Sequence, residues 1–190
     1  MSKHVVILCG LETIYNPDGS FKLFSTTFFN NANTYVIDHP DETVDIIDAR
    51  DYRDCVKPMS AVMGKLRSIA KLSAIDMLVY NGHSSCNNLL MFYKWSSTSS
   101  NDERFITEHT SWKDIEFSGH SKIELWSCRT GGNYIEDKTC IAQQIANNSK
   151  VPTWGYICRT SQKKIGNKYY QKPEKAEYYL IEFKPMGQTT

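Results

Sequence analysis

Hydrophobic positions along the chain follow two alternating patterns, and the alternation predicts an α/β fold. Short runs of consecutive apolar and β-branched residues, closed by glycine or a polar turn, are typical of buried strands. Six runs fit this description: His4–Gly10, Thr43–Asp51, Met77–Tyr80, Ile123–Ser127, Val151–Cys158 and Ala176–Pro185. They predict a mostly parallel central sheet of about six strands, because helical patterns separate several of them.

The segments between these runs carry helix and turn signals. Pro58–Ser73 opens with proline and has apolar residues at helical spacing, namely Met59, Val62, Met63, Leu66, Ile69 and Ala70. Lys138–Ser149 has a second apolar helical face, and Ser111–Phe117 predicts a short helix capped by serine. The NPDGS turn at Asn16–Ser20 has aromatic neighbours and predicts a hairpin or a packed loop.

The order of these elements predicts one domain over residues 1–190, because no linker or internal repeat divides the chain. Right-handed crossovers would place helices on both faces of the sheet and give a three-layer sandwich. In such folds the chemistry lies beyond the carboxyl ends of the strands.

Charge and cysteine content exclude several classes of protein. The net charge is +1, from 22 basic and 21 acidic residues, which gives no reason to expect nucleic acid or a membrane as a partner. The six cysteines form no CxxC motif, so we expect six thiols and no zinc ribbon. The first apolar run is too short for a signal peptide, and no run is long enough for a membrane helix. These features favour a cytoplasmic protein and leave a secreted effector open.

Two strand ends carry residues suited to nucleophilic catalysis. His83 follows the run in DMLVYNGHSS, and Cys128 follows the run in KIELWSCRTGG. An imidazole can take the proton of a thiol and later protonate a leaving amine. The backbone amides of Ser84 and Cys128 lie in tight turns and are the candidate donors to an oxyanion. Either residue alone is more often a loop or packing residue, so the hypothesis depends on the pair.

Other candidate sites are weaker. Gly82–Cys86 approaches the GxSxG nucleophile elbow of serine hydrolases with Ser84 as nucleophile, but Cys86 replaces the second glycine. The polar contexts of His39, His109 and His120 predict loop residues, and no third ligand indicates a metal site. Cys9 ends the first strand and is expected to be a buried thiol. The basic, tyrosine-containing segment Ser161–Lys175 is interpreted as a solvated face or a substrate-facing flap.

The blocks LVYNGHSS (Leu78–Ser85) and IELWSCRTGG (Ile123–Gly132) resemble those of the caspase-like cysteine peptidases. This group contains caspases, gingipains, clostripain, CHAT-domain proteases and the self-cleaving domains of large bacterial toxins. Its members share an apolar strand that ends in His-Gly and a later apolar strand that ends in Cys. The resemblance extends in topology from Val5 to Phe183, but its specific signal lies in the two blocks.

This resemblance implies a caspase-like fold and a cysteine endopeptidase that needs no cofactor. It implies that His83 is the general base and acid, that Cys128 is the nucleophile, and that a protein or peptide is the substrate, with an activator or regulatory partner also expected. It places Trp154 and the segment Cys158–Gln162, which contains Arg159, near the substrate. Ser84 departs from the family, which has glycine there, so a catalytically degenerate binding module is the alternative.

Overall fold

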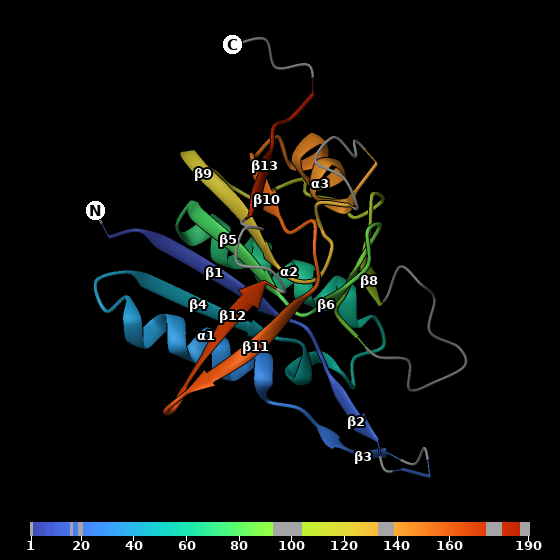
Figure 1. The fold of residues 1–190 in the computed structure, drawn as a ribbon. Coiled ribbons are helices and arrows are strands. Elements are labelled where there is room, and N and C mark those ends of the chain that lie inside the picture. Colours follow the sequence, from blue (N-terminus) through green and yellow to red (C-terminus); the bar gives the residue numbers. More distant parts are fainter. Residues whose placement is uncertain are drawn as a thin grey trace.

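A six-stranded sheet forms the centre of the protein in a computed structural model that describes residues 2–15, 17–18, 21–92, 104–132, 139–173 and 180–186 (Figure 1). The strand order is β13-β10-β9-β5-β1-β4. The strands are β1 (His4–Cys9), β4 (Thr43–Asp48), β5 (Ile75–Asn81), β9 (Phe117–Trp126), β10 (Thr153–Gly155) and β13 (Ile181–Phe183). The pairs from β4 to β10 are parallel, and β13 is antiparallel to β10. The predicted mostly parallel α/β sheet is therefore confirmed.

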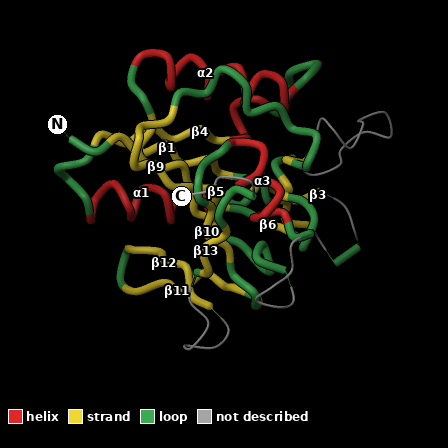
Figure 2. Tube along the Cα trace, turned by 90° about the horizontal axis from the view of Figure 1, so that it is seen from above, coloured by secondary structure: helices red, strands yellow, loops and turns green. Residues whose placement is uncertain are grey.

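Helices cover both faces of this sheet. The helices are α1 (Thr27–Asp38), α2 (Pro58–Leu72) and α3 (Ile141–Ser149), and a 3₁₀ turn, η1 (Ala49–Tyr52), follows β4. Successive residues of a strand point to opposite faces. Val6 and Leu8 accordingly join the core under α2 and α3, whereas Val5 and Ile7 join the core under α1. Figure 2 shows α2 and α1 on opposite sides of the strands.

Three smaller sheets flank the carboxyl ends of the strands. The hairpin predicted around the NPDGS turn forms from β2 (Thr13–Tyr15) and β3 (Phe21–Phe24). The strands β6 (His83–Ser84), β7 (Leu89–Leu90) and β8 (Phe105–Ile106) form a second sheet. The third is the hairpin of β11 (Thr160–Ile165) and β12 (Lys168–Pro173).

The β11–β12 hairpin lies against α1, next to the face of the sheet that α1 covers. Asn31 Nδ2 donates to the carbonyl of Tyr169 at 2.7 Å, and the amide of Tyr169 donates to Thr34 Oγ1 at 2.8 Å. Buried polar groups need such partners, so these two bonds fix the position of the hairpin. The hairpin then extends the covering of this face towards β9 and β10 (Figure 1).

Two local predictions are wrong. Ser111–Phe117 contains a turn and no helix, because Asp114 takes a positive φ of 64° and Arg67 donates to the carbonyls of Ser111 and Lys113. One turn of helix provides too few hydrogen bonds to compete with such tertiary contacts. His120 lies in β9 and not in a loop, because β9 begins at Phe117, and this residue falls in the irregular stretch between the pairs Ile75–Phe117 and Met77–Lys122.

Several boundaries also differ from the sequence predictions; β5 and β9, for example, begin before the predicted runs, and α3 begins at Ile141. β4 ends at Asp48, whose carboxylate accepts from the amide of Arg50 and so caps η1. β10 and β13 are shorter than the apolar runs that predicted them. Lys138, the start of one predicted helix, and the serine-rich loop at 96–102 lie outside the described residues.

Candidate active site

The register of β5 and β9 brings His83 and Cys128 to the same cavity. Asn81 of β5 is paired with Trp126 of β9. His83 follows Asn81 by two positions, and Cys128 follows Trp126 by two positions. Both side chains line a cavity of about 200 Å³ that also involves Phe28 and Gln162. The two residues that the sequence analysis selected therefore meet at the carboxyl ends of neighbouring parallel strands.

The ring of His83 is held by contacts from two sides. Its Nε2 lies 3.2 Å from Glu12 Oε1, and its plane meets the ring of Phe28 edge-on at a centroid distance of 5.1 Å. The hydroxyl of buried Tyr80 lies 2.6 Å from the carbonyl of His83 and fixes the backbone of this turn. The side chain of His83 is 48% exposed, so the ring remains accessible from the cavity.

Glu12 is a site residue that the sequence reasoning missed. It follows β1 by three positions, and β1 neighbours β5 in the sheet. The hydrogen bond from His83 lowers the pKa of the Glu12 carboxyl and outweighs the opposing effect of partial burial. An acidic residue just after the first strand was the available signal, since the carboxyl ends of parallel strands share one edge.

The thiol of Cys128 is half-buried and contacts the start of β11. The amide of Thr160 donates to Sγ at 3.3 Å, and Sγ lies 3.4 Å from the carbonyl of Thr160. Arg129 takes a positive φ of 53°, and its amide donates to the carbonyl of Cys158 at 2.9 Å. Within the described part of the chain, no hydrogen bond joins Cys128 Sγ to the ring of His83.

Two serines connect the turns that carry the candidate residues. Ser84 Oγ donates to the carbonyl of Cys128, and Ser127 Oγ lies 2.6 Å from Ser84 Oγ and 2.7 Å from the carbonyl of Gly82. The hydroxyl of Ser84 is thus engaged by the Cys128 turn, and Ser84 does not line the cavity. This geometry gives no support to Ser84 as a nucleophile.

The backbone amides of Ser84 and Cys128, which were predicted to be oxyanion donors, have no hydrogen-bond acceptor among the described residues. Ser85 N donates to Asn88 O at 3.0 Å, and hydrogen-bonded pairs alternate along an antiparallel ladder. The pair Ser84–Leu89 is therefore a non-hydrogen-bonded one, and the Ser84 amide points away from β7. The Cys128 amide lies outside regular structure, and none of the described residues accepts from it.

Of the residues expected near the substrate, Thr160, Ser161 and Gln162 line the cavity, whereas Trp154 and Arg159 do not. Trp154 is in the middle of β10, with Lys122 Nζ 6.0 Å from its ring centroid, and Arg159 is exposed beside Thr160. Neither lines the cavity that contains Cys128. The segment that does line it, besides the turns themselves, is the β11–β12 hairpin, through Thr160, Ser161, Gln162 and Gln171.

The other cysteines and histidines form no comparable site. All six cysteines are free thiols, as predicted, and Cys9 is buried with Sγ 3.7 Å from the carbonyl of Phe28. Burial raises the pKa of Cys9 far above its usual value. His39 stacks on Tyr35 at 3.9 Å, and no cluster of three metal-ligating side chains occurs among the described residues.

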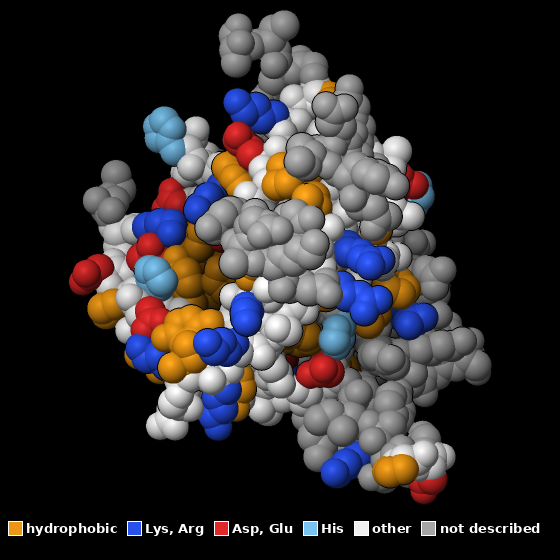
Figure 3. Space-filling view, in the orientation of Figure 1, with side chains coloured by type: hydrophobic (Ala, Val, Ile, Leu, Met, Phe, Trp, Pro, Cys, Tyr) orange, Lys and Arg blue, Asp and Glu red, His pale blue; other side chains and the backbone are white. Residues whose placement is uncertain are grey.

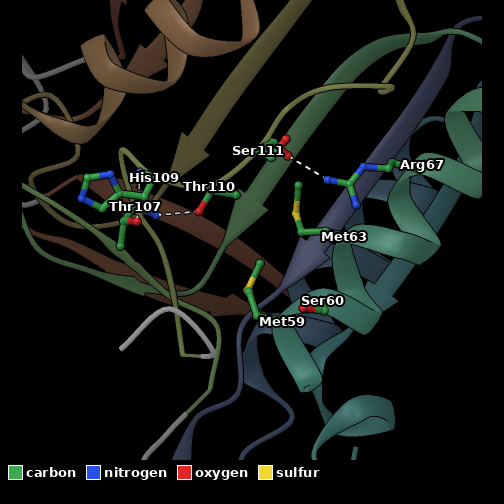
Figure 4. A pocket seen from close by; sticks show the side chains of 8 residues that line it. All are labelled: Met59, Ser60, Met63, Arg67, Thr107, His109, Thr110 and Ser111. Atoms are coloured by element: carbon green, nitrogen blue, oxygen red, sulfur yellow. Dashed lines mark hydrogen bonds between the residues drawn. The ribbon is translucent and has the colours of Figure 1, made fainter. Parts of the chain in front are cut away.

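A separate cavity of about 310 Å³ lies between α2 and the segment Thr107–Ser111. Figure 4 shows Arg67 bound to the backbone of Ser111 on one side and His109 on the opposite side. The ring of His109 lies 3.5 Å from the carboxylate of its neighbour Glu108, and its amide donates to Thr107 Oγ1 at 3.2 Å. This cavity contains no cysteine among its described lining residues, whereas the cavity at Cys128 is lined by both a cysteine and a histidine.

No family model and no curated protein matches this chain. Among the described residues, no helix is long and apolar enough to cross a membrane. The case for a function therefore depends on the geometry of the residues themselves.

Proposed function

We propose that the protein is a cysteine endopeptidase with the three-layer sandwich of the caspase-like peptidases. The observation that carries the proposal is the shared cavity of His83 and Cys128 at the carboxyl ends of two adjacent parallel strands. The helices on both faces of the sheet and the order of elements after Cys128, a helix followed by a strand, support the same architecture.

In the proposed mechanism His83 exchanges protons through Nδ1. A neutral imidazole has one N–H and one acceptor nitrogen. If Nε2–H donates to the carboxylate of Glu12, the lone pair lies on Nδ1 and is available to the thiol. Glu12 is then a positioning residue, which fixes the tautomer and stabilises the imidazolium that forms when His83 takes the proton.

The reaction follows acyl transfer through a thioester. The proton of Cys128 moves to His83, and the sulfur attacks the carbonyl carbon of the substrate. His83 returns the proton to the amine as the C–N bond breaks, which leaves an acyl-thioester. A water then loses a proton to His83 and attacks the thioester, and the carboxylic acid departs as the proton returns to sulfur.

Three backbone amides stabilise the charged states of this pathway. The Thr160 amide, 3.3 Å from Sγ, favours a thiolate at Cys128. The free amides of Ser84 and Cys128 are the proposed donors to the tetrahedral oxyanion. A serine amide performs this role as well as a glycine amide, because the side chain of Ser84 is directed to the carbonyl of Cys128.

Substitution of the proposed nucleophile tests this function. Cys128→Ala should abolish cleavage of a denatured protein substrate, whereas Cys86→Ala, which removes another partly exposed thiol, should leave it intact. Full cleavage by Cys128→Ala would exclude the mechanism. Because an activator is an expected partner, alkylation provides a second readout that does not depend on turnover. Cys128 should react with iodoacetamide at about pH 6 much faster than the other thiols, since an ordinary thiol is protonated there.

A second candidate function is a binding module that keeps this fold without catalysis. It is favoured by the contact of the Cys128 thiol with the carbonyl of Thr160, since a thiol that donates to that carbonyl is held protonated. Slow and uniform alkylation of all the exposed cysteines at about pH 6 would support this candidate over the peptidase.

A further inference from the structure

Thr160, at the start of β11, presents three polar groups to the sulfur of Cys128. Its amide nitrogen and its carbonyl oxygen lie 3.3 Å and 3.4 Å from Sγ, and its hydroxyl oxygen Oγ1 lies 3.6 Å from Sγ. The amide can only donate to the sulfur and the carbonyl can only accept from the thiol, whereas a hydroxyl can do either. The direction of the hydroxyl therefore decides whether the side chain of Thr160 favours the thiolate or the thiol.

The direction of the Thr160 hydroxyl depends on a chain of side-chain amides that begins in the core. Asn81 Nδ2 donates to the carbonyl of Phe28 at 2.9 Å and to Asn31 Oδ1 at 2.8 Å. A backbone carbonyl can only accept, so the bond to Phe28 identifies this atom of Asn81 as the nitrogen. Asn31 is fixed in the same way, because its Nδ2 donates to the carbonyl of Tyr169 at 2.7 Å.

Two glutamines of the β11–β12 hairpin continue this chain from Asn81 to Thr160. Asn81 Oδ1 accepts from Gln162 Nε2 at 3.3 Å, and Gln162 Nε2 also donates to Oε1 of Gln171, its cross-strand partner. The nitrogen of Gln171 then lies on the side of Thr160 and donates to Oγ1. Since Gln171 supplies a hydrogen to Oγ1, the hydrogen of the hydroxyl itself is directed to the sulfur of Cys128.

The glutamines of this chain lie on the inner face of the hairpin. Gln162 and Gln171 are half-buried, whereas Lys163 and Lys172, their neighbours on the same strands, are exposed. Figure 3 shows Lys and Arg side chains on the surface over this part of the molecule. Hydrogen bonds away from water are electrostatically stronger, and bonds in a chain polarise one another. The chain of amides is therefore suited to hold the Thr160 hydroxyl in one orientation.

The donors of Thr160 remain directed at the sulfur after its proton has left. Among the described residues that line the cavity, the titratable groups besides Cys128 are His83 and Glu12. In the proposed mechanism the proton of Cys128 moves to His83, and the thiol then no longer donates to the carbonyl of Thr160. The amide and the hydroxyl of Thr160 both donate to the negative sulfur, and hydrogen bonds to an ionised acceptor are about twice as strong as neutral ones.

We propose that Thr160 is a catalytic residue whose hydroxyl stabilises the thiolate of Cys128, and that Gln171 is the positioning residue that directs this hydroxyl. The inference rests on the proposed function, because it takes Cys128 as the nucleophile. It makes the β11–β12 hairpin part of the catalytic machinery, in addition to a cover of the sheet. His83 exchanges the proton, and Thr160 stabilises the charge that the proton leaves behind.

The pH profile of alkylation tests the role of the hydroxyl without turnover. Each protein is treated with iodoacetamide between about pH 5 and 10, and mass spectrometry of the peptide that contains Cys128 gives the rate. Thr160→Val keeps the shape of the side chain without the hydroxyl and should raise the midpoint of the profile by about one pH unit, and Thr160→Ser should restore the midpoint. The rate at high pH should not fall, because a more basic thiolate is intrinsically more nucleophilic.

The outcomes separate this inference from the peptidase function. A midpoint in Thr160→Val equal to that of the wild type would overturn the inference and leave the peptidase function standing. A shift that Thr160→Ser does not reverse would also overturn it, because the effect would not belong to the hydroxyl. The expected shift in a protein without Cys128-dependent cleavage would support the contact with the sulfur and count against the peptidase function.

Thr34→Val is the matched control, because it also removes a threonine hydroxyl that holds the hairpin, through the amide of Tyr169. Thr34 does not line the cavity of Cys128, so this variant should leave the midpoint unchanged. A shift in Thr34→Val equal to that in Thr160→Val would assign the effect to loosening of the hairpin and overturn the inference.

A double-mutant cycle tests the role of Gln171. Gln171→Met removes the donor to Oγ1 and should raise the midpoint in the wild type. In the Thr160→Val background it should have no effect, because it acts through the hydroxyl that this background lacks. Additive shifts would exclude Gln171 as the positioning residue.

Discussion

Gly155 on β10 is a position near the candidate site where a single added methyl group should lower the stability of the protein. A Cβ built there lies 2.8 Å from the amide nitrogen of Gly131 and 2.8 Å from Thr130 Oγ1. Both atoms belong to the turn that follows Cys128, and the first is backbone, so it cannot move as a flexible side chain would. Gly155→Ala should therefore push this turn away from β10.

The expected cost combines overpacking with loss of hydrogen bonds. Insertion of a methyl group into a packed site costs about 1–3 kcal/mol. The Gly131 amide donates to Tyr156 O at 2.9 Å, and the Tyr156 amide donates to Thr130 Oγ1 at 3.1 Å. Displacement of the turn weakens both bonds, at about 1 kcal/mol each. We expect a total loss of about 3–5 kcal/mol in the free energy of unfolding.

Gly64 in the interior of α2 provides the control, because a Cβ there meets no atom within 4 Å. Gly64→Ala should stabilise the protein by about 0.5–1 kcal/mol through helix propensity. Urea denaturation followed by far-UV circular dichroism measures both changes. If the free energy of unfolding of Gly155→Ala lies within about 1 kcal/mol of the wild-type value, the contact between β10 and the Cys128 turn is not tight, and the reasoning is refuted.

Three further predictions concern the residues that hold the candidate site. Tyr80→Phe removes a hydroxyl that bonds the carbonyl of His83 and should cost about 1–2 kcal/mol in urea denaturation. Asn81→Leu removes the buried bonds of its side chain to the Phe28 carbonyl and to Asn31 Oδ1 and should cost about 2–4 kcal/mol in the same assay. Glu12→Gln should slow cleavage. The pKa of the Glu12 carboxyl is lowered in the folded protein, so the ionised carboxylate stabilises the fold above about pH 4.3, and this stabilisation is lost as the pH falls further. The unfolding free energies of the wild type and of Glu12→Gln should therefore converge as the pH is lowered.

The centre of the sheet was predictable because β1 and β5 are almost wholly apolar runs. Parallel strands buried on both faces have this pattern, as β1 and β5 do. Helix α1 was not predicted, because its sequence TFFNNANTYVID is rich in threonine and asparagine, which have low intrinsic helix propensity. Tertiary contacts of Phe28 and Ala32 with the sheet stabilise it instead.

The candidate pair was predictable for a similar reason, whereas its surroundings were not. His83 and Cys128 each follow an apolar run, so a rule about strand ends was enough to select them. The prediction of Glu12 as a site residue would have required the knowledge that β1 neighbours β5, and the sequence does not show the order of the strands. The chain of amides that ends at Thr160 draws side chains from α1, β5 and the β11–β12 hairpin, and only the folded chain brings them together.

The side chain of Ser84 is accommodated by hydrogen bonds within the candidate site. Its hydroxyl could have crowded the oxyanion position, but it donates to the carbonyl of Cys128 and contacts Ser127, which is 1% exposed. A glycine there would keep the amide and leave the buried hydroxyl of Ser127 with fewer partners, and unpaired buried polar groups are costly. The pair of serines therefore acts as a link between the ends of β5 and β9. The same bonds that hold this link set the separation of His83 and Cys128, so serine at position 84 is compatible with catalysis and is not by itself evidence for a degenerate site.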